Sequence, residues 1–272
     1  MSDPLVLVTG PADGPAPGVA EIALNRPDKM NAIVWDMIRE MIDAAETLGQ
    51  DPATRAIVLR GEGRAFCSGL DKANFGKMAE TGQSSSSGAD LMARSHGIAN
   101  LPQHASLVWR DCPVPVIAAL HGVCIGGGLQ IAMGADIRIA APDCRLAILE
   151  MKWGLIPDMS GMVTFPRSIR GDVLRRLIYT NEMLSGAPAQ EAGLVTEIAE
   201  DPLARARALA AEIAAKSPSA MRSAKALINA AEENDPAEVL LEESRRQIEA
   251  IGTPDQIETV TAALEGRAAR YG

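Results

Sequence analysis

The sequence has 272 residues, of which 47% are hydrophobic and 22% are charged, which is typical of a globular protein with a substantial core. Its net charge of −9 and aromatic content of 3% disfavour nucleic acid as the main partner. Phosphate binding relies on clustered Lys and Arg, and base stacking relies on aromatic rings. No segment approaches the roughly 20 apolar residues of a membrane span, and the start lacks the basic region of a secretory signal. We therefore expect a cytoplasmic protein with no nucleic-acid and no membrane partner.

The cysteines and histidines form no metal or redox pattern. The four cysteines lie in apolar stretches and match no zinc or redox spacing; they are Cys67, Cys112, Cys124 and Cys144. The three histidines are too dispersed for a metal site; they are His96, His104 and His121. We therefore expect reduced, buried thiols and no metal, with a structural role for His121 at the end of a strand.

Short apolar runs rich in β-branched residues divide the first 200 residues and predict strands. These runs are 19–25 (VAEIALN), 55–61 (RAIVLRG), 115–122 (PVIAALHG), 135–141 (ADIRIAA) and 195–200 (VTEIAE). Helical patterns lie between them, and 33–49 (IVWDMIREMIDAAETLG) places its apolar residues on one face. This alternation predicts an α/β fold with crossover connections.

From about Asp201 onward the strand pattern ends and four consecutive helices are predicted. Prolines stand near their starts, at Pro202, Pro218, Pro236 and Pro254. Such a helical region packs either on its own core or on a neighbouring subunit. Two loops are also predicted, 13–18 (DGPAPG) and 80–90 (ETGQSSSSGAD). Because 80–90 follows a glycine-containing turn, it is either a lid over a site or a plain surface loop.

Several motifs with a known chemistry are missing. The opening LVLVTGPADG has the strand and glycine of a dinucleotide fold, but prolines obstruct a helix there and no G-x-G-x-x-G follows. The sequence also lacks the G-K-[ST] of a P-loop and the G-x-S-x-G of a nucleophile elbow.

Two glycine-rich turns each follow a predicted strand, at 63–71 (GRAFCSGLD) and 122–134 (GVCIGGGLQIAMG). Open α/β sheets place ligands at such strand ends. We expect a helix to begin near Gly127, where its first N–H groups lack partners and glycine lets a ligand oxygen approach them. Taken alone, the second turn favours a plainer interpretation, which is tight packing of a helix against the sheet.

Together with three further segments, these turns resemble the enoyl-CoA hydratase/isomerase family, the crotonase superfamily. In the family's order and spacing, the segments are 25–33 (NRPDKMNAI), 63–71, 122–140, 150–161 (EMKWGLIPDMSG) and 184–195 (LSGAPAQEAGLV). The resemblance implies the crotonase fold, which is ClpP-like: a repeated ββα superhelical core, here 1–200, that binds acyl-CoA and carries catalysis. It also implies a C-terminal helical trimerisation region, here 201–272, and a homotrimer or dimer of trimers.

The resemblance implies an acyl-CoA thioester as substrate, with coenzyme A as part of the substrate and no separate cofactor. The backbone N–H groups of Ser68 and Gly127 would form an oxyanion hole for the thioester carbonyl. The basic residues expected near the phosphates, if they are not solvated surface charges, are Arg26, Lys29 and Arg64. The backbone expected beside adenine and pantetheine belongs to Ala65, Ser68, Gly69, Leu70 and Asp71. The loop 80–90 would shape the wall of the acyl pocket.

The acid–base residues depart from the family's hydratases, which use two glutamates. One glutamate matches Glu150, but the other position holds Gln130, whose amide cannot take a proton at neutral pH. The similarity to the family's single-glutamate isomerases favours enoyl-CoA isomerisation, with Glu150 moving a proton between C2 and C4. Asp158 stands where the family's dienoyl-CoA isomerases carry an aspartate, and it either faces the pocket or caps a loop. If Asp158 is a second carboxylate, enoyl-CoA hydration is the alternative.

Other activities on this fold stay open. They are thioesterase, decarboxylase and dehalogenase chemistry, of which the last needs a nucleophilic aspartate that only Asp158 could supply. A non-catalytic RNA-binding member is a remote alternative. Such members carry a Lys-rich helix, whereas helix 33–49 has one Arg and no Lys against four acidic residues.

Overall fold

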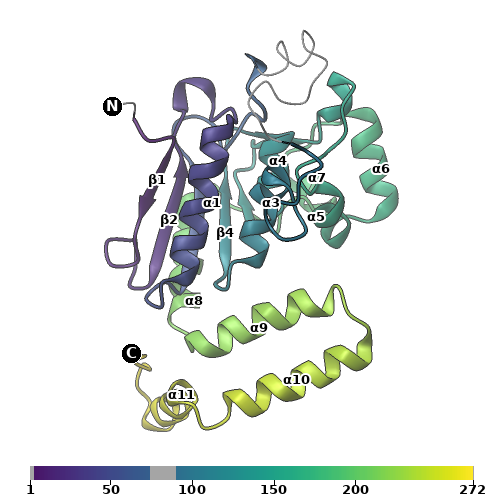
Figure 1. Ribbon diagram of the computed structural model, residues 1–272. Helices are drawn as coiled ribbons and strands as arrows, with labels where there is room; N and C mark the ends of the chain where they lie inside the picture. The colour runs from purple at the N-terminus through teal and green to yellow at the C-terminus, as the bar shows by residue number, and fades with distance from the viewer. Residues whose placement is uncertain (1–2, 74–89, 272) are drawn as a thin grey trace.

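A computed structural model describes residues 3–73 and 90–271, and its centre is a six-stranded sheet (Figure 1). The strand order is β1–β2–β3–β4–β6–β8. Strand β1 pairs antiparallel with β2, and all other neighbours are parallel. The strands are β1 (Val6–Thr9), β2 (Val19–Leu24), β3 (Ala56–Gly61), β4 (Val116–Leu120), β6 (Ile137–Ala140) and β8 (Glu197–Ile198). The α/β class expected from the sequence is confirmed.

All five apolar runs that predicted strands lie in this sheet, and the helix expected at 33–49 is α1 (Trp35–Gln50). Strand β1 is the strand of the opening LVLVTGPADG. The pair β5 (Val123–Ile125) and β7 (Arg145–Ala147), which form a second, parallel sheet, was not predicted. Three residues are too few to show a periodicity. Of the loop 80–90 only Asp90 lies within the described residues, so the lid and acyl-wall predictions fall outside them.

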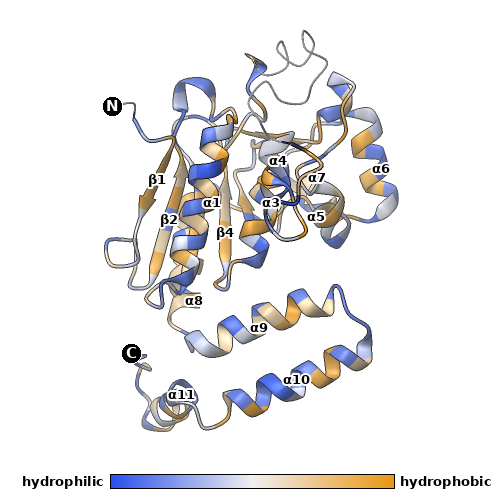
Figure 2. Cartoon of the chain, in the orientation of Figure 1, coloured by the Kyte–Doolittle hydropathy of each residue, from blue (hydrophilic) through white to orange (hydrophobic). Residues whose placement is uncertain are grey.

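Helices cover both faces of the sheet (Figures 1 and 2). On one face, α1 buries an apolar stripe that includes Met37, Ile38 and Met41, and α3 (Leu101–Asp111) packs beside it. On the other face, the small side chains of α8 (Pro202–Ala214) pack closely on the strands. Between residues 27 and 191 the structure also describes η1 (Pro27–Lys29), α4 (Gly127–Ala132), η2 (Glu150–Trp153), α5 (Gly161–Ser168), α6 (Gly171–Thr180) and α7 (Gly186–Glu191).

The four predicted C-terminal helices are α8 and three that extend below the core in Figure 1, namely α9 (Pro218–Ala231), α10 (Pro236–Ala250) and α11 (Pro254–Glu265). Each begins with the proline noted in the sequence, and the side chain of the preceding residue caps it by accepting a backbone N–H bond. The first helix, α8, packs on the core sheet, whereas α9 to α11 project. The division of the chain at residue 200 stays a prediction. Within the described ranges, no helix has the length and apolarity needed to cross a bilayer.

A buried ion pair joins α9 to the core. Lys225 Nζ lies 2.7 Å from Asp136 Oδ2 and donates to the carbonyl oxygens of Trp109 at 2.9 Å and Val114 at 3.0 Å. The same Asp136 oxygen accepts the N–H of Val116 at 2.7 Å. Since Lys225 is only 6% exposed, its ammonium depends on the Asp136 carboxylate and the two carbonyls for its hydrogen bonds. This cluster therefore fixes where the projecting helices leave the core.

Replacing the buried ammonium should destabilise the protein strongly. We expect Lys225→Met to lower the free energy of unfolding by about 3–5 kcal/mol, because it removes the cation that neutralises the buried Asp136 carboxylate and the donor to two carbonyls. Lys216→Met, at an exposed lysine between α8 and α9, is the control and should change it by less than about 0.5 kcal/mol. Urea unfolding followed by circular dichroism measures both. Equal effects of the two variants would show that the ion pair does not hold α9 on the core.

Candidate active site

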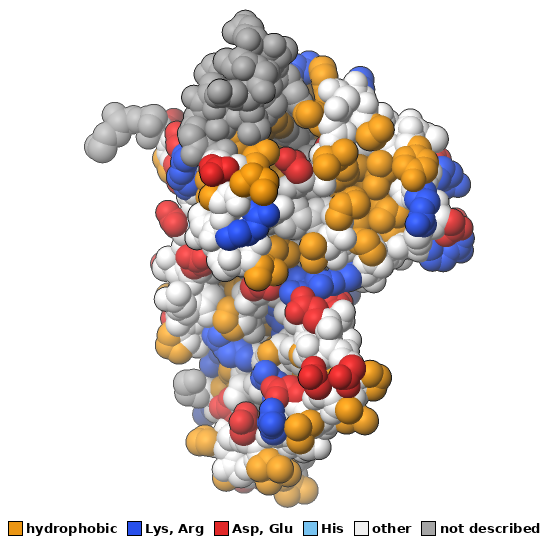
Figure 3. Space-filling model, turned by 45° about the vertical axis from the view of Figure 1, so that its right-hand side comes forward, with side chains coloured by type: hydrophobic (Ala, Val, Ile, Leu, Met, Phe, Trp, Pro, Cys, Tyr) orange, Lys and Arg blue, Asp and Glu red, His pale blue; other side chains and the backbone are white. Residues whose placement is uncertain are grey.

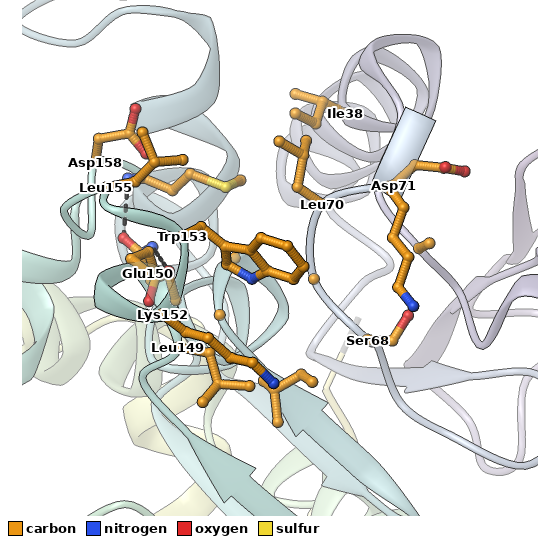
Figure 4. A pocket seen from close by; sticks show the side chains of 18 of the residues that line it. Ile38, Ser68, Leu70, Asp71, Leu149, Glu150, Lys152, Trp153, Leu155 and Asp158 are labelled. Carbon is orange, nitrogen blue, oxygen red and sulfur yellow. Dashed lines mark hydrogen bonds between the residues drawn. The ribbon is translucent and has the colours of Figure 1, made fainter. Parts of the chain in front are cut away.

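A cavity of about 900 Å³ opens where β3, β5 and β7 lead into turns and short helices. One wall comes from η1, the start of α1 and residues 68–72, and the other comes from residues 125–130 and 149–159. In Figure 4, Glu150 and Asp158 lie on one side of this cavity, Leu70 and Ser68 lie on the other, and the Trp153 indole lies between them. The cavity thus brings together four of the five segments that resemble the family's motifs, and the fifth, 184–195, does not line it.

The three glycines of the second turn each meet a separate steric demand. Gly126 has φ 54° and ψ −129°, which suits glycine, and it precedes α4. A Cβ on Gly127 would lie 2.8 Å from Met159 Sδ, and one on Gly128 would lie 2.6 Å from the Cβ of Cys67. Both interpretations of the glycines therefore apply. They allow close packing around α4, and Gly127 also lines the cavity, where a ligand oxygen could approach its N–H. As the first helical residue, Gly127 has no acceptor for its N–H within the helix.

The amide predicted for the other half of the oxyanion hole is occupied. The N–H of Ser68 donates to the carbonyl oxygen of Met30 at 2.9 Å. Two of the next three amides are also occupied. The N–H of Gly69 faces the Cys67 thiol, and the N–H of Asp71 donates to the carbonyl oxygen of Ile33 at 3.0 Å.

Between these amides lies Leu70, whose N–H has no acceptor among the described residues. The segment runs beside α4, since a Cβ on Gly69 would lie 3.7 Å from the nitrogen of Gly127. The Ser68 N–H is therefore already bound within the protein, and the Leu70 N–H is the one in this segment that is left without an acceptor. A position in a turn does not reveal which of several successive amides points inward, so the sequence could not separate them.

The glutamate Glu150 is held by the amide that replaces the family's other glutamate. Gln130 Nε2 donates to Glu150 Oε1 at 2.6 Å, while Gln130 Oε1 accepts the N–H groups of Met159 at 2.9 Å and Gly161 at 3.0 Å. The second carboxylate oxygen of Glu150, Oε2, is buried without a hydrogen-bond partner. Burial raises the pKa of Glu150, and the Asp158 charge raises it further, against the lowering effect of Gln130.

Asp158 lines the same cavity, which answers the question that the sequence left open. Its carboxylate is accessible from the cavity but surrounded by protein, and burial raises its pKa. The Asp158 charge in turn raises the pKa of Glu150. Two carboxyls and one amide thus meet at the end of an otherwise largely apolar cavity.

The residues expected beside coenzyme A divide into two groups. Lys29, Ser68, Gly69, Leu70 and Asp71 line the cavity, whereas Arg26, Arg64 and Ala65 do not. The Arg26 guanidinium instead binds within the protein, to the Ala32 carbonyl and, at 3.0 Å, to Asp71 Oδ2. Two further lysines that the sequence did not single out, Lys72 and Lys152, also line the cavity. Lys152 stands two residues after Glu150, a proximity that could have indicated it.

The histidines and cysteines stay outside this chemistry. His121 Nε2 lies 2.9 Å from the Gly63 carbonyl oxygen, in keeping with the structural role expected for it. All four cysteines are free and buried. No group of His, Cys, Asp and Glu suited to hold a metal ion occurs in residues 3–73 and 90–271.

Known proteins resemble this chain in both sequence and fold. The sequence model of the enoyl-CoA hydratase/isomerase family matches residues 15–272. A protein of Mycobacterium bovis named "Probable enoyl-CoA hydratase echA8" is 34% identical over 255 residues, which cover 93% of this chain and 94% of that protein. The mitochondrial methylglutaconyl-CoA hydratase of Mus musculus is 32% identical over 263 residues, covering 93% and 79%. The crystal structure of an enoyl-CoA hydratase from Bacillus anthracis has a TM-score of 0.86 and 28% identity, covering 98% of this chain and 99% of that one.

The fold and the cavity are therefore those of a crotonase-fold enzyme that acts on acyl-CoA thioesters. The chain belongs to the enoyl-CoA hydratase/isomerase family. The resemblance found in the sequence is confirmed, as is the fold that it implied.

The amide of Gly127 can be tested in a Met159→Ala background, which removes the thioether that a Cβ would meet at 2.8 Å and leaves the end of the Ile33 side chain, at 3.0 Å, as a contact common to both variants. In that background Gly127→Ala keeps the N–H, whereas Gly127→Pro removes it at a first helical position that tolerates proline. We expect proline to lower kcat on an acyl-CoA substrate about 10²–10³-fold relative to alanine. Equal kcat values for two folded variants would exclude this amide as a donor.

Proposed function

We propose that this enzyme transfers protons at the α-carbon of an acyl-CoA thioester and isomerises 3-enoyl-CoA to 2-enoyl-CoA. The observation that carries this proposal is the state of Glu150, which lines the cavity: one carboxylate oxygen is bound by Gln130, and the other is buried and has no hydrogen-bond partner. A carboxylate with one unpartnered oxygen can accept a proton from C2 and return it at C4. A raised pKa suits both steps, because the group must act as base and then as acid near neutral pH.

The oxyanion hole of this proposal consists of the N–H groups of Leu70 and Gly127. Both lie on the cavity, and neither has an acceptor among the described residues. They would bind the thioester oxygen as negative charge develops on it, and each such donor is worth roughly 3–4 kcal/mol of transition-state stabilisation. Leu70 takes the place that the sequence suggested for Ser68.

Coenzyme A is part of the substrate in this proposal, and no separate cofactor is needed. Lys29 and Lys72 lie on the same wall as the backbone of residues 68–71 and can attract its phosphates. Arg26 does not line the cavity, but it forms an ion pair with Asp71, which does. The role predicted for Arg64 receives no support, since this residue does not line the cavity.

Hydration of 2-enoyl-CoA is the second candidate, and the position of Asp158 supports it. Addition of water requires one group that activates the water and one that protonates the α-carbon. Asp158 and Glu150 line one cavity, and the Asp158 charge raises the pKa of Glu150, so they could divide these tasks. The names of the relatives, which are hydratases, point the same way.

Removal of the Glu150 carboxylate tests both candidates at once. We expect Glu150→Gln to lower turnover about 10²–10⁴-fold, the contribution typical of a positioned acid–base group, while binding of a saturated acyl-CoA is retained. Turnover by absorbance and binding by calorimetry measure the two effects. A variant that keeps most of its turnover on the best substrate would refute the role of Glu150.

Asp158 decides between the two reactions. If isomerisation is the activity, the wild type converts a 3-enoyl-CoA readily and hydrates crotonyl-CoA at least about 10²-fold more slowly, and Asp158→Asn keeps the isomerase activity. Because the Asp158 charge raises the pKa of Glu150, the substitution should also move the acidic limb of the pH–rate profile to lower pH. Fast hydration by the wild type that Asp158→Asn abolishes would instead establish the second candidate.

A homotrimer or dimer of trimers is part of the proposal as well. The three projecting helices expose large apolar side chains, which Figure 3 shows among charged ones at the lower end of the molecule. They are Ile228, Leu240, Leu241, Ile248, Ile251, Ile257, Val260 and Leu264. Apolar surface of this extent supports contact with further copies of the chain. The four free cysteines support the cytoplasm as a reducing location.

A further inference from the structure

Gln130 is a neutral residue in a place where the surrounding structure fixes every polar atom of its side chain. The residue is 1% exposed. Its oxygen accepts two backbone N–H groups, from Met159 and Gly161, so the NH₂ group must face Glu150. A flipped amide would place an NH₂ group against two N–H donors and an oxygen against a carboxylate. The amide therefore has a single possible orientation.

The glycine at position 161 is part of the same arrangement. A Cβ on Gly161 would lie 2.8 Å from Gln130 Oε1 and 2.6 Å from a ring carbon of Phe165. The backbone can approach the Gln130 amide only because position 161 has no side chain. The loop that carries Asp158 is thus anchored on Gln130 by its own backbone, on both sides of Ser160.

We propose that Gln130 is a positioning residue that binds Oε1 of Glu150 and the loop bearing Asp158 at once, and so commits Oε2 of Glu150 to proton transfer. This inference rests on the proposed role of Glu150. Gln130 itself touches no reacting atom. Its oxygen fixes the loop and its nitrogen fixes the carboxylate, so one side chain sets how both acidic groups face the substrate.

The neutral charge of Gln130 follows from this geometry. At 2.6 Å from Glu150 Oε1, a carboxylate oxygen in place of the NH₂ group would require a shared proton. The charged side chains that share the cavity are Lys152 on η2, Asp158 on the following loop, and Asp28, Lys29, Asp71 and Lys72 on the opposite wall. Gln130 donates a hydrogen bond to Glu150 and lowers its pKa, which offsets part of the effect of burial.

Two substitutions separate the two ends of the amide. Gln130→Glu keeps an acceptor for the N–H groups of Met159 and Gly161 but loses the donor to Glu150. Gln130→Met, of similar length, loses both. We expect each variant to lower kcat at neutral pH roughly 10²-fold and to move the acidic limb of the pH–rate profile to higher pH, because the carboxylate form of Glu150 is no longer stabilised. This shift is opposite in direction to that expected for Asp158→Asn.

A carboxyl titration that does not depend on turnover accompanies the kinetics. The Glu150 carboxyl carbon is identified by ¹³C NMR as the resonance that Glu150→Gln removes, and it should titrate at higher pH in Gln130→Met than in the wild type. If Glu150→Gln is inactive but both Gln130 variants keep the wild-type profile, or lose the same factor at every pH with an unchanged titration, the inference about Gln130 is overturned. If Glu150→Gln stays active, the proposed function fails instead.

Discussion

The hydrogen bond from Gln130 to Glu150 is the interaction on which the site depends. It joins α4, which follows the glycine turn, to η2, which carries the glutamate, and it binds a carboxylate whose other oxygen is buried without a partner. Burial alone would favour a neutral, inert carboxyl, and a strong ion pair would favour a carboxylate too stable to be protonated. A single neutral donor, the Gln130 amide, stabilises the carboxylate form of Glu150 less than an ion pair would. The chemistry proposed for Glu150 requires that balance.

The rest of the fold brings the two ends of this bond together. The parallel strands of the main sheet and the small sheet β5–β7 direct their turns to one place, where ligands bind in open α/β folds. Gly127, Gly128 and Gly161 allow backbone to approach Met159, Cys67 and Gln130 at distances that a Cβ would forbid. Close packing and an unpartnered amide therefore arise from the same glycines.

The sequence predicted the larger elements and missed the smaller geometry, for physical reasons. Strands such as 55–61 and the helix at 33–49 are long enough for their apolar pattern to show which face is buried. Strands β5 and β7 have three residues each and form by pairing with each other, a tertiary contact that no local pattern shows. The sequence indicated Glu150 and Gln130 by their motif positions, but it could not show that they are hydrogen-bonded. It also could not show that Asp158 faces the cavity, or that the Ser68 N–H donates to the Met30 carbonyl oxygen, because tertiary contacts decide both.

The central claim is that Glu150 removes a proton from the α-carbon of a thioester held by two backbone amides. Exchange of the α-protons of butyryl-CoA in D₂O, followed by ¹H NMR, measures this step without requiring isomerisation or hydration. The account predicts that the wild type exchanges these protons, and that Glu150→Gln slows the exchange at least about 10²-fold while still binding butyryl-CoA. Exchange at the wild-type rate in Glu150→Gln would contradict it.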